Sequence, residues 1–197
     1  MEKPGTPDIY LASTSPRRRE LLARIGVRFE TLRIDVAEDV LPDEAPETYV
    51  LRLALAKARA GQAALDHRPA RPVLGADTCI AVDGMILGKP RDRGHGLAML
   101  ARLSGREHRV LSAVAVVAGS REATRLSVSH VHFRDIDVNE AERYWATGEP
   151  ADKAGGYAIQ GLGALFVRHL EGSYSGVMGL PLFETAELLT DFGIGLI

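Results

Sequence analysis

The chain has 197 residues, with 24 lysines and arginines against 26 acidic residues and a formal net charge of −2. A nucleic-acid-binding domain usually carries a clear basic excess, so this balance disfavours DNA or RNA as a partner. Charges or glycines interrupt every apolar run, which argues against a membrane span. A single cysteine cannot form an internal disulfide, and the N-terminal stretch lacks the apolar centre of a signal peptide. We therefore expect a cytoplasmic protein.

The hydrophobic pattern predicts strands and helices that alternate along one domain, residues 1–197. The predicted strands are 9–13, 29–34, 73–82, 85–87, 108–119, 123–136 and 162–170, and the predicted helices are 16–25, 47–65, 93–105, 138–148 and 181–193. The Asp83-Gly84 dipeptide predicts one hairpin, and a second joins 108–119 to 123–136. Interleaved helices together with hairpins indicate an α/β fold with a mixed sheet.

Two segments of this pattern have particular features. The helix 47–65 gives the strongest helical signal, with Val50, Leu53, Ala54 and Lys57 at helical spacing. The glycine-rich segment 155–163 is expected to be the only long irregular stretch inside the fold, and such stretches are often functional.

The first motif is LASTSPRRRELL at 11–22, where a strand leads into a helix. Ser15 suits the N-cap and Pro16 the first helical position. Arg17 and Arg18 then stand in the first turn, where cations oppose the helix dipole and cost stability unless an anion is bound. Because helix N-termini bind anions, the motif favours a phosphate site over a solvated charged face.

The stretch GADTC places Asp77 inside an apolar strand. A carboxylate there is rarely left unpaired. Asp77 is therefore either a hydrogen-bonded structural acid or a metal ligand or base, and its sequence context leaves both readings open. Cys79 lies on the same face because strand side chains alternate. It has no His partner nearby, so buried packing is favoured over a nucleophilic role.

Two further patterns fall short of known motifs. GMILGKP at 84–90 has three residues between its glycines rather than the four of a phosphate-binding loop, and Pro90 follows the lysine. Lys89 can still meet a phosphate as a point charge, with an exposed lysine as the alternative. His130 and His132 share a strand face that two metal ligands could use, but no third Cys or His presents itself, which disfavours zinc.

The loop DKAGGYAIQGLG at 152–163 combines glycines with Lys153, Tyr157 and Gln160. A glutamine amide both donates and accepts hydrogen bonds, which suits the edge of a nucleobase. An ordinary surface loop is the alternative interpretation.

The motifs LASTSPRRRELL, GADT, LGKP, DKAGGYAIQGLG and GSYSGVMGLPLFET occur in this order along nearly the whole chain. Together they closely resemble the Maf family of nucleotide pyrophosphatases. YAIQGLG and GSYS…GLPL resemble the branch of the family that acts on dTTP and UTP. The resemblance implies an elongated mixed sheet flanked by helices, with two lobes and a central cleft, a fold of the Maf/ITPase type.

The resemblance also implies hydrolysis of a nucleoside triphosphate to the monophosphate and pyrophosphate with a divalent metal, Mg²⁺ being expected and Mn²⁺ the alternative. By matching positions, Asp77 is the proton acceptor, Asp77 and Glu38 are the metal ligands, and Lys89 joins them as a catalytic residue. The implied substrate-binding residues are Ser13, Ser15, Arg17, Arg18, Thr78, Lys153 and Gln160.

The sequence departs from the family pattern at three places. Ala37 stands where many relatives carry an acid, which makes the metal role of Glu38 less secure. Gly176 replaces a common asparagine, and Ser112 replaces the usual threonine.

These observations give one mechanism and two rivals. In the mechanism, Asp77 takes a proton from water that attacks the α-phosphorus, and no covalent intermediate forms. The first rival keeps the fold and hydrolyses 7-methyl-GTP or a damaged nucleotide. The second is a regulatory nucleotide-binding protein of septum formation and cell division. A homodimer is compatible with the sequence, which does not require one.

Overall fold

The computed structural model describes residues 6–196, so residues 1–5 and 197 of the predicted domain lie outside the described part. No helix in that part is long and apolar enough to span a membrane. In chain order the strands and α-helices are β1 (Ile9–Leu11), α1 (Pro16–Arg24), β2 (Phe29–Thr31), α2 (Pro46–Ala63), β3 (Val73–Val82), β4 (Met85–Leu87), α3 (Arg93–Leu103), β5 (Glu107–Ala118), β6 (Arg121–Phe133), α4 (Val138–Ala146), β7 (Val167–Glu171), α5 (Tyr174–Met178) and α6 (Leu182–Asp191).

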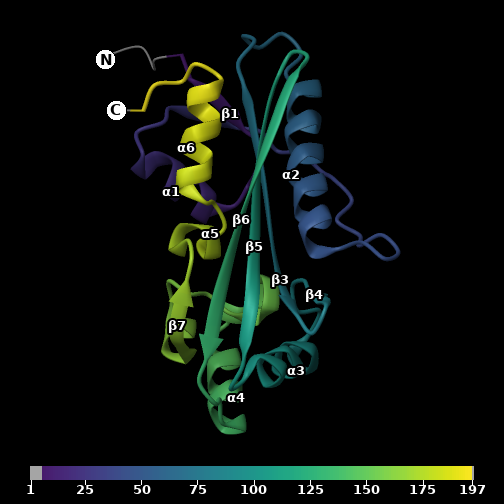
Figure 1. The fold of residues 1–197 in the computed structure, drawn as a ribbon, viewed down its shortest axis with the longest axis vertical. Helices are drawn as coiled ribbons and strands as arrows, with labels where there is room; N and C mark the ends of the chain where they lie inside the picture. The colour runs from purple at the N-terminus through teal and green to yellow at the C-terminus, as the bar shows by residue number, and fades with distance from the viewer. Residues whose placement is uncertain (1–5, 197) are drawn as a thin grey trace.

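A seven-stranded sheet forms the centre of the molecule, in the order β2-β1-β3-β5-β6-β7, with β4 paired to β3 off this path. β1 runs parallel to β2 and β3, whereas the pairs β3–β5, β5–β6 and β6–β7 are antiparallel. The predicted mixed α/β sheet is therefore confirmed. Figure 1 shows an elongated molecule in which β5 and β6 run along most of its length.

Helices cover both faces of this sheet and gather at its two ends. Toward one end of the molecule, α2 packs on one face of the sheet and α1 and α6 lie on the other. α3, α4 and β7 lie toward the other end (Figure 1). The α2 face buries Tyr49, Val50, Leu53, Ala54 and Ala58 against apolar residues of β3 and β5. The layers thus follow the usual rule that each apolar stripe is buried against a neighbouring element.

α2 approaches β3 unusually closely at Gly75. A Cβ atom at this position would lie 2.3 Å from the carbonyl oxygen of Ala54 and 2.6 Å from the amide nitrogen of Ala58. Only glycine permits that separation, because it has no Cβ. The close contact brings the middle of α2 against the strand segment that follows Gly75, which carries Asp77.

The structure corrects three expectations. The strand predicted over 162–170 is wrong in its first half, because Leu162–Phe166 is the 3₁₀ turn η3 and β7 begins only at Val167. The amides of Leu162 and Gly163 donate to the Glu149 carboxylate instead of a strand partner. Helix α5 was not predicted. The segment 32–45 is a second long stretch without helix or strand, so 155–163 is not the only one.

The contact at Gly75 predicts that Gly75→Ala destabilises the protein by roughly 1–3 kcal/mol, because the added methyl group meets backbone atoms that cannot rotate away. Chemical denaturation measures the change in the free energy of unfolding. Gly88→Ala is the matched control, since a Cβ there has no atom within 4 Å. Equal stability of the two variants would contradict the proposed role of the contact.

Candidate active site

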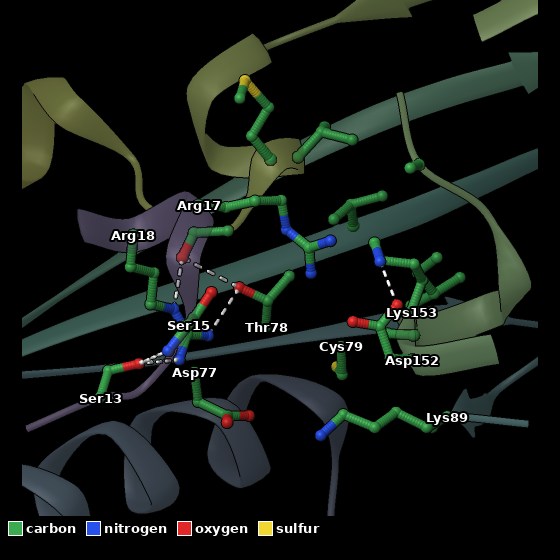
Figure 2. Close-up of a pocket in the computed structure, with 18 of the residues that line it drawn as sticks. Ser13, Ser15, Arg17, Arg18, Asp77, Thr78, Cys79, Lys89, Asp152 and Lys153 are labelled. Carbon is green, nitrogen blue, oxygen red and sulfur yellow. Dashed lines mark hydrogen bonds and ion pairs between the residues drawn. The ribbon is translucent and has the colours of Figure 1, made fainter. Parts of the chain in front are cut away.

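One cavity of about 610 Å³ opens where β1 meets α1, beside β3 and the glycine-rich loop. All of the site residues expected from the sequence line it: Ser13, Ser15, Arg17, Arg18, Glu38, Asp77, Thr78, Lys89, Lys153 and Gln160. Figure 2 shows most of them as side chains that converge from separate elements. Their individual roles remain predictions, but their common location is a property of the fold.

The start of α1 has the expected form. Ser15 is the N-cap, with extended backbone angles of φ −61° and ψ 119°, and Pro16 occupies the first turn. The Ser15 hydroxyl makes no capping hydrogen bond within residues 6–196, and the Ser15 amide donates to Ser13 Oγ at 3.2 Å. Residues 15–18 line the cavity, and the amides of the first turn have no side-chain cap from Ser15, an arrangement that suits an anion.

The two arginines of the first turn have different surroundings. Arg18 Nε donates to the carbonyl oxygen of Gly179 at 2.8 Å, and its terminal nitrogens donate to Ser13 Oγ at 3.4 Å and Thr78 Oγ1 at 3.5 Å. Arg17 instead extends into the cavity (Figure 2). Arg18 therefore joins the β1–α1 connection, β3 and the α5–α6 connection, whereas Arg17 presents its charge to the cavity.

The centre of the site is a lysine held between two carboxylates. Lys57 Nζ lies 2.6 Å from Asp77 Oδ1 and 2.6 Å from Glu38 Oε1. Lys57 and Asp77 are only 7% and 6% exposed. Lys57 comes from α2, Asp77 from β3 and Glu38 from the irregular segment 32–45, so this ion pair joins three separate parts of the chain.

The surroundings shift the two carboxylates in opposite directions. Burial raises the pKa of Asp77 above its ordinary value, although Lys57 and Arg18 act against that shift. Burial also opposes ionisation of Glu38, but its hydrogen bond to Lys57 and the charges of Lys57, Lys89 and Arg18 outweigh it and lower the pKa of Glu38. A buried carboxylate with a raised pKa beside a cavity is typical of a general base.

A hydroxyl chain lies on the other side of β3 from Asp77. Thr78 Oγ1 is 2.9 Å from Ser112 Oγ, which donates to the carbonyl oxygen of Gly176 at 2.6 Å. Ser112, which stands where the family pattern usually has a threonine, thus still provides a hydroxyl at this position. At Gly176, a Cβ would come within 3.1 Å of Ser173 Cβ, so the glycine accommodates a tight turn into α5.

Two more cationic side chains complete the cavity wall. Lys89 is exposed and reaches toward the cavity from the segment after β4, and Lys153 forms an ion pair with Asp152 (Figure 2). Asp152 was not predicted as a site residue. It lies near both Arg17 and Lys153, and hydrogen bonding and attraction from these cations hold its pKa below the ordinary value.

The glycine-rich loop forms the remaining wall. Gln160 is exposed at the cavity, whereas Tyr157 is buried and its hydroxyl lies 2.8 Å from Nε2 of His108 on β5. The rings of His108, Phe133 and Tyr157 pack edge to face, with His108 4.9 Å from Phe133 and Phe133 4.7 Å from Tyr157 between ring centroids. This aromatic cluster fixes one end of the loop to the sheet.

Two other candidates from the sequence lie in different surroundings. Cys79 is buried on the α2 face, and burial raises the pKa of its thiol to about 12, so packing explains it. His130 and His132 both contact Glu107, at 2.6 Å and 3.2 Å. β7 brings His169 beside His132, a proximity that the sequence does not reveal. Residues 6–196 contain no group of three or more His, Cys, Asp or Glu side chains arranged to hold a metal.

Lys57 is the main site residue that sequence reasoning missed. It falls on the apolar face of α2, at helical spacing from Val50, Leu53 and Ala54, and was grouped with them. The available signal was its charge: a lysine at a core position is almost never buried unless it is paired. An acid inside the apolar strand β3 was the matching partner.

A buried carboxylate, cationic walls and an open helix start are features that suit a polyanionic ligand. The family model for Maf-like proteins matches residues 8–192, and the chain belongs to the Maf family. Its relatives include the dTTP/UTP pyrophosphatase of Alkalilimnicola ehrlichii, 62% identical over 98% of this chain and 97% of that protein. The proteins of the same description from Saccharophagus degradans and Aromatoleum aromaticum are 55% and 54% identical, over 96% and 97% of this chain and 91% and 98% of theirs.

Among solved structures, the Staphylococcus aureus Ham1 protein is similar over 64% of this chain and 71% of that one, with a TM-score of 0.45 and 14% identity. This likeness is too distant to inform the site.

His108 predicts a measurable pH dependence of stability. Burial lowers its pKa from 6.5 to about 4, so between these values the unfolded chain binds a proton that the folded protein does not. Unfolding is therefore favoured as the pH falls, and this group should remove roughly 3 kcal/mol of stability between pH 7 and pH 4.

Urea denaturation across this range measures the effect. His108→Gln, which retains a hydrogen-bonding group for Tyr157, should show a flatter dependence than the wild type. His67→Gln, at an exposed position, is the matched control and should keep the wild-type slope. Parallel curves for the wild type and His108→Gln would contradict the role of His108.

Proposed function

We propose that this protein hydrolyses dTTP and UTP to the nucleoside monophosphate and pyrophosphate. The observation that carries the proposal is Asp77, a buried carboxylate with a raised pKa, held by Lys57 at a cavity whose walls carry Arg17, Lys89 and Lys153. The activity in the names of relatives 51–62% identical to this chain supports the same conclusion.

The triphosphate is bound through its charge. Its anionic tail lies over the start of α1, where uncapped amides and Arg17 meet it, and Lys89 and Lys153 approach from the facing segments. Arg18 acts indirectly, because its hydrogen bonds are directed to Ser13, Thr78 and Gly179 and fix the shape of this pocket. The ion pair with Asp152 holds Lys153 in place until a phosphate competes for it.

The donor set fits a divalent cation of the Mg²⁺ type. Such a cation prefers oxygen ligands and is usually held by one or two carboxylates together with substrate phosphates and water. Asp77 and Glu38 lie on either side of Lys57 Nζ and would supply those carboxylates. When bound, the cation would neutralise phosphate charge that repels a nucleophile. Mg²⁺ is the expected metal and Mn²⁺ the alternative.

Asp77 acts as the base. It accepts a proton from water as the water oxygen forms a bond to the α-phosphorus, and the bond from that phosphorus to the pyrophosphate oxygen breaks. Lys57 stabilises the Asp77 carboxylate and orients it, and Arg17, Lys89 and Lys153 stabilise the charge that accumulates on the departing pyrophosphate. No step requires a covalent intermediate.

The nucleobase of the substrate is recognised by the glycine-rich loop. Uracil and thymine present an N3 donor beside carbonyl acceptors. The amide of Gln160 accepts a hydrogen bond from the N3 donor and donates one to a neighbouring carbonyl oxygen. Cytosine presents an acceptor at N3 and a donor at N4, so an amide held in the orientation that matches uracil or thymine does not pair with it. The loop therefore supplies selectivity for the pyrimidines of UTP and dTTP.

The proposal predicts pyrophosphate release from dTTP and UTP with Mg²⁺, and a loss of roughly 10²–10⁴-fold in kcat in Asp77→Asn, because the amide cannot act as a base. Pyrophosphate and orthophosphate are assayed separately over a panel of nucleoside triphosphates that includes 7-methyl-GTP. In ¹⁸O-water the label should enter the monophosphate. Asp83→Asn, at an exposed turn, is the control and should retain activity.

Three outcomes would contradict this scheme. Preferential hydrolysis of 7-methyl-GTP would assign the chain to that substrate. No hydrolysis of any nucleotide in the panel would favour a regulatory nucleotide-binding protein of cell division. Label in the pyrophosphate would exclude attack at the α-phosphorus.

Gln160→Ala tests the base readout. We expect the preference for UTP over CTP, as the ratio of kcat/KM values, to fall roughly tenfold, since a lost hydrogen bond to a recognised group is worth about 1 kcal/mol or more. Gln62→Ala is the matched control, because Gln62 bonds to Gly119 away from the cavity. An unchanged ratio in Gln160→Ala would remove Gln160 from base recognition.

A further inference from the structure

The loop that carries Gln160 is folded around a single carboxylate that lies outside the cavity. We infer that Glu149 is a positioning residue that fixes this loop and thereby sets base selectivity. The inference rests on the proposed role of the loop in reading the base. Neither Glu149 nor its partner Tyr144 lines the cavity, so both act through the backbone of the loop.

The contacts bracket Gln160 on both sides. After it, the amides of Leu162 and Gly163 donate to Glu149 Oε2 and Oε1, each at 3.0 Å. Before it, the amide of Ala158 donates to the Tyr144 hydroxyl at 3.1 Å, and that hydroxyl donates to Glu149 Oε1 at 2.7 Å. Glu149 is thus connected to the chain on each side of Gln160.

The chemistry of this cluster requires an acceptor at residue 149. A tyrosine hydroxyl has one proton, and Tyr144 can accept from Ala158 only with that proton directed elsewhere. The Glu149 carboxylate receives it and also two backbone amides, a set of donors that suits an ionised acid. Burial opposes ionisation of Glu149, but these hydrogen bonds outweigh it and hold the pKa below its ordinary value.

The glycines of the loop fit the same arrangement. A Cβ at Gly161 would lie 2.2 Å from Glu149 Oε2, and a Cβ at Gly163 would lie 2.8 Å from the Tyr144 hydroxyl oxygen. The carboxylate and the hydroxyl therefore occupy the space that side chains at these positions would need. Internal hydrogen bonds from Gly161 to Ala158 and from Ala164 to Gly161, both 3.1 Å, close the loop over them.

The test compares Glu149→Gln with Tyr144→Phe. In Glu149→Gln, one end of the side chain becomes a donor that faces backbone donors. Tyr144→Phe removes the hydroxyl that joins Ala158 to Glu149 and leaves the hydrogen bonds from Leu162 and Gly163 to Glu149 in place. Glu142→Gln is the matched control, because Glu142 lies on the same helix as Tyr144 and pairs with Arg93 at the exposed surface. Thermal unfolding shows whether each variant is folded. If Glu149→Gln does not fold, Tyr144→Phe alone is used for the test.

Three readouts separate positioning from general damage. We expect the UTP:CTP ratio of kcat/KM values to fall at least fivefold in both variants, with the larger change in KM. Inhibition by inorganic tripolyphosphate, which has no base, should stay within twofold of the wild type. Hydrogen exchange at the amides of Ala158, Leu162 and Gly163 should accelerate, while Glu142→Gln should match the wild type in all three.

Each contrary result overturns a different statement. Unchanged exchange would show that Glu149 does not hold the loop, and faster exchange with an unchanged UTP:CTP ratio would show that the held loop does not set selectivity. An equal loss of tripolyphosphate binding would indicate general damage and overturn the inference. A wild type that hydrolyses neither UTP nor dTTP would overturn the proposed function instead, because amide exchange is measured without turnover.

Discussion

The buried ion pair of Lys57 with Asp77, to which the half-exposed Glu38 carboxylate adds a second contact, is the constraint on which the rest of the site depends. Removing one partner of a buried ion pair typically costs about 3–5 kcal/mol, because a charge is left without compensation. The contact exists only because Gly75 lets α2 lie against β3. A backbone feature with no chemistry of its own therefore determines where the Asp77 carboxylate lies and brings Lys57 within contact of it.

The two ends of the cavity are built by different means. The phosphate end is formed by regular elements, with Arg17 at the start of α1 and Asp77 within β3, so its geometry follows from the sheet and its helices. The base end is an irregular loop whose shape depends on individual hydrogen bonds, through Glu149 on one side and the Tyr157–His108 contact on the other. In the proposed function, Arg17 and Asp77 therefore belong to regular elements, whereas Lys153 and Gln160 share the irregular segment 152–163.

The sequence predicted the parts of this structure that rest on local pattern. Long strands such as β3, β5 and β6 alternate clearly or are continuously apolar, and the helix start at Ser15-Pro16 has its own residue signature. Lys57 was missed because its helical spacing groups it with the apolar face of α2, although its charge at a core position indicates a buried partner. The strand predicted over the first half of 162–170 was wrong because the amides of Leu162 and Gly163 bind Glu149, which lies 13 and 14 residues away along the chain. Contacts of this kind leave no periodicity in the sequence.

The β5–β6 hairpin also has a mechanical consequence. Its register is continuous from Glu107 opposite His132 to Ala118 opposite Arg121, along both ends of the molecule. A hinge motion of one end of the molecule against the other would bend the β5–β6 hairpin and break the hydrogen bonds between its strands. Any change in the width of the cavity would then fall to segments outside this ladder, of which 33–45 lies in neither a helix nor a strand. The β5–β6 hairpin would meanwhile keep the two ends of the molecule at a fixed separation.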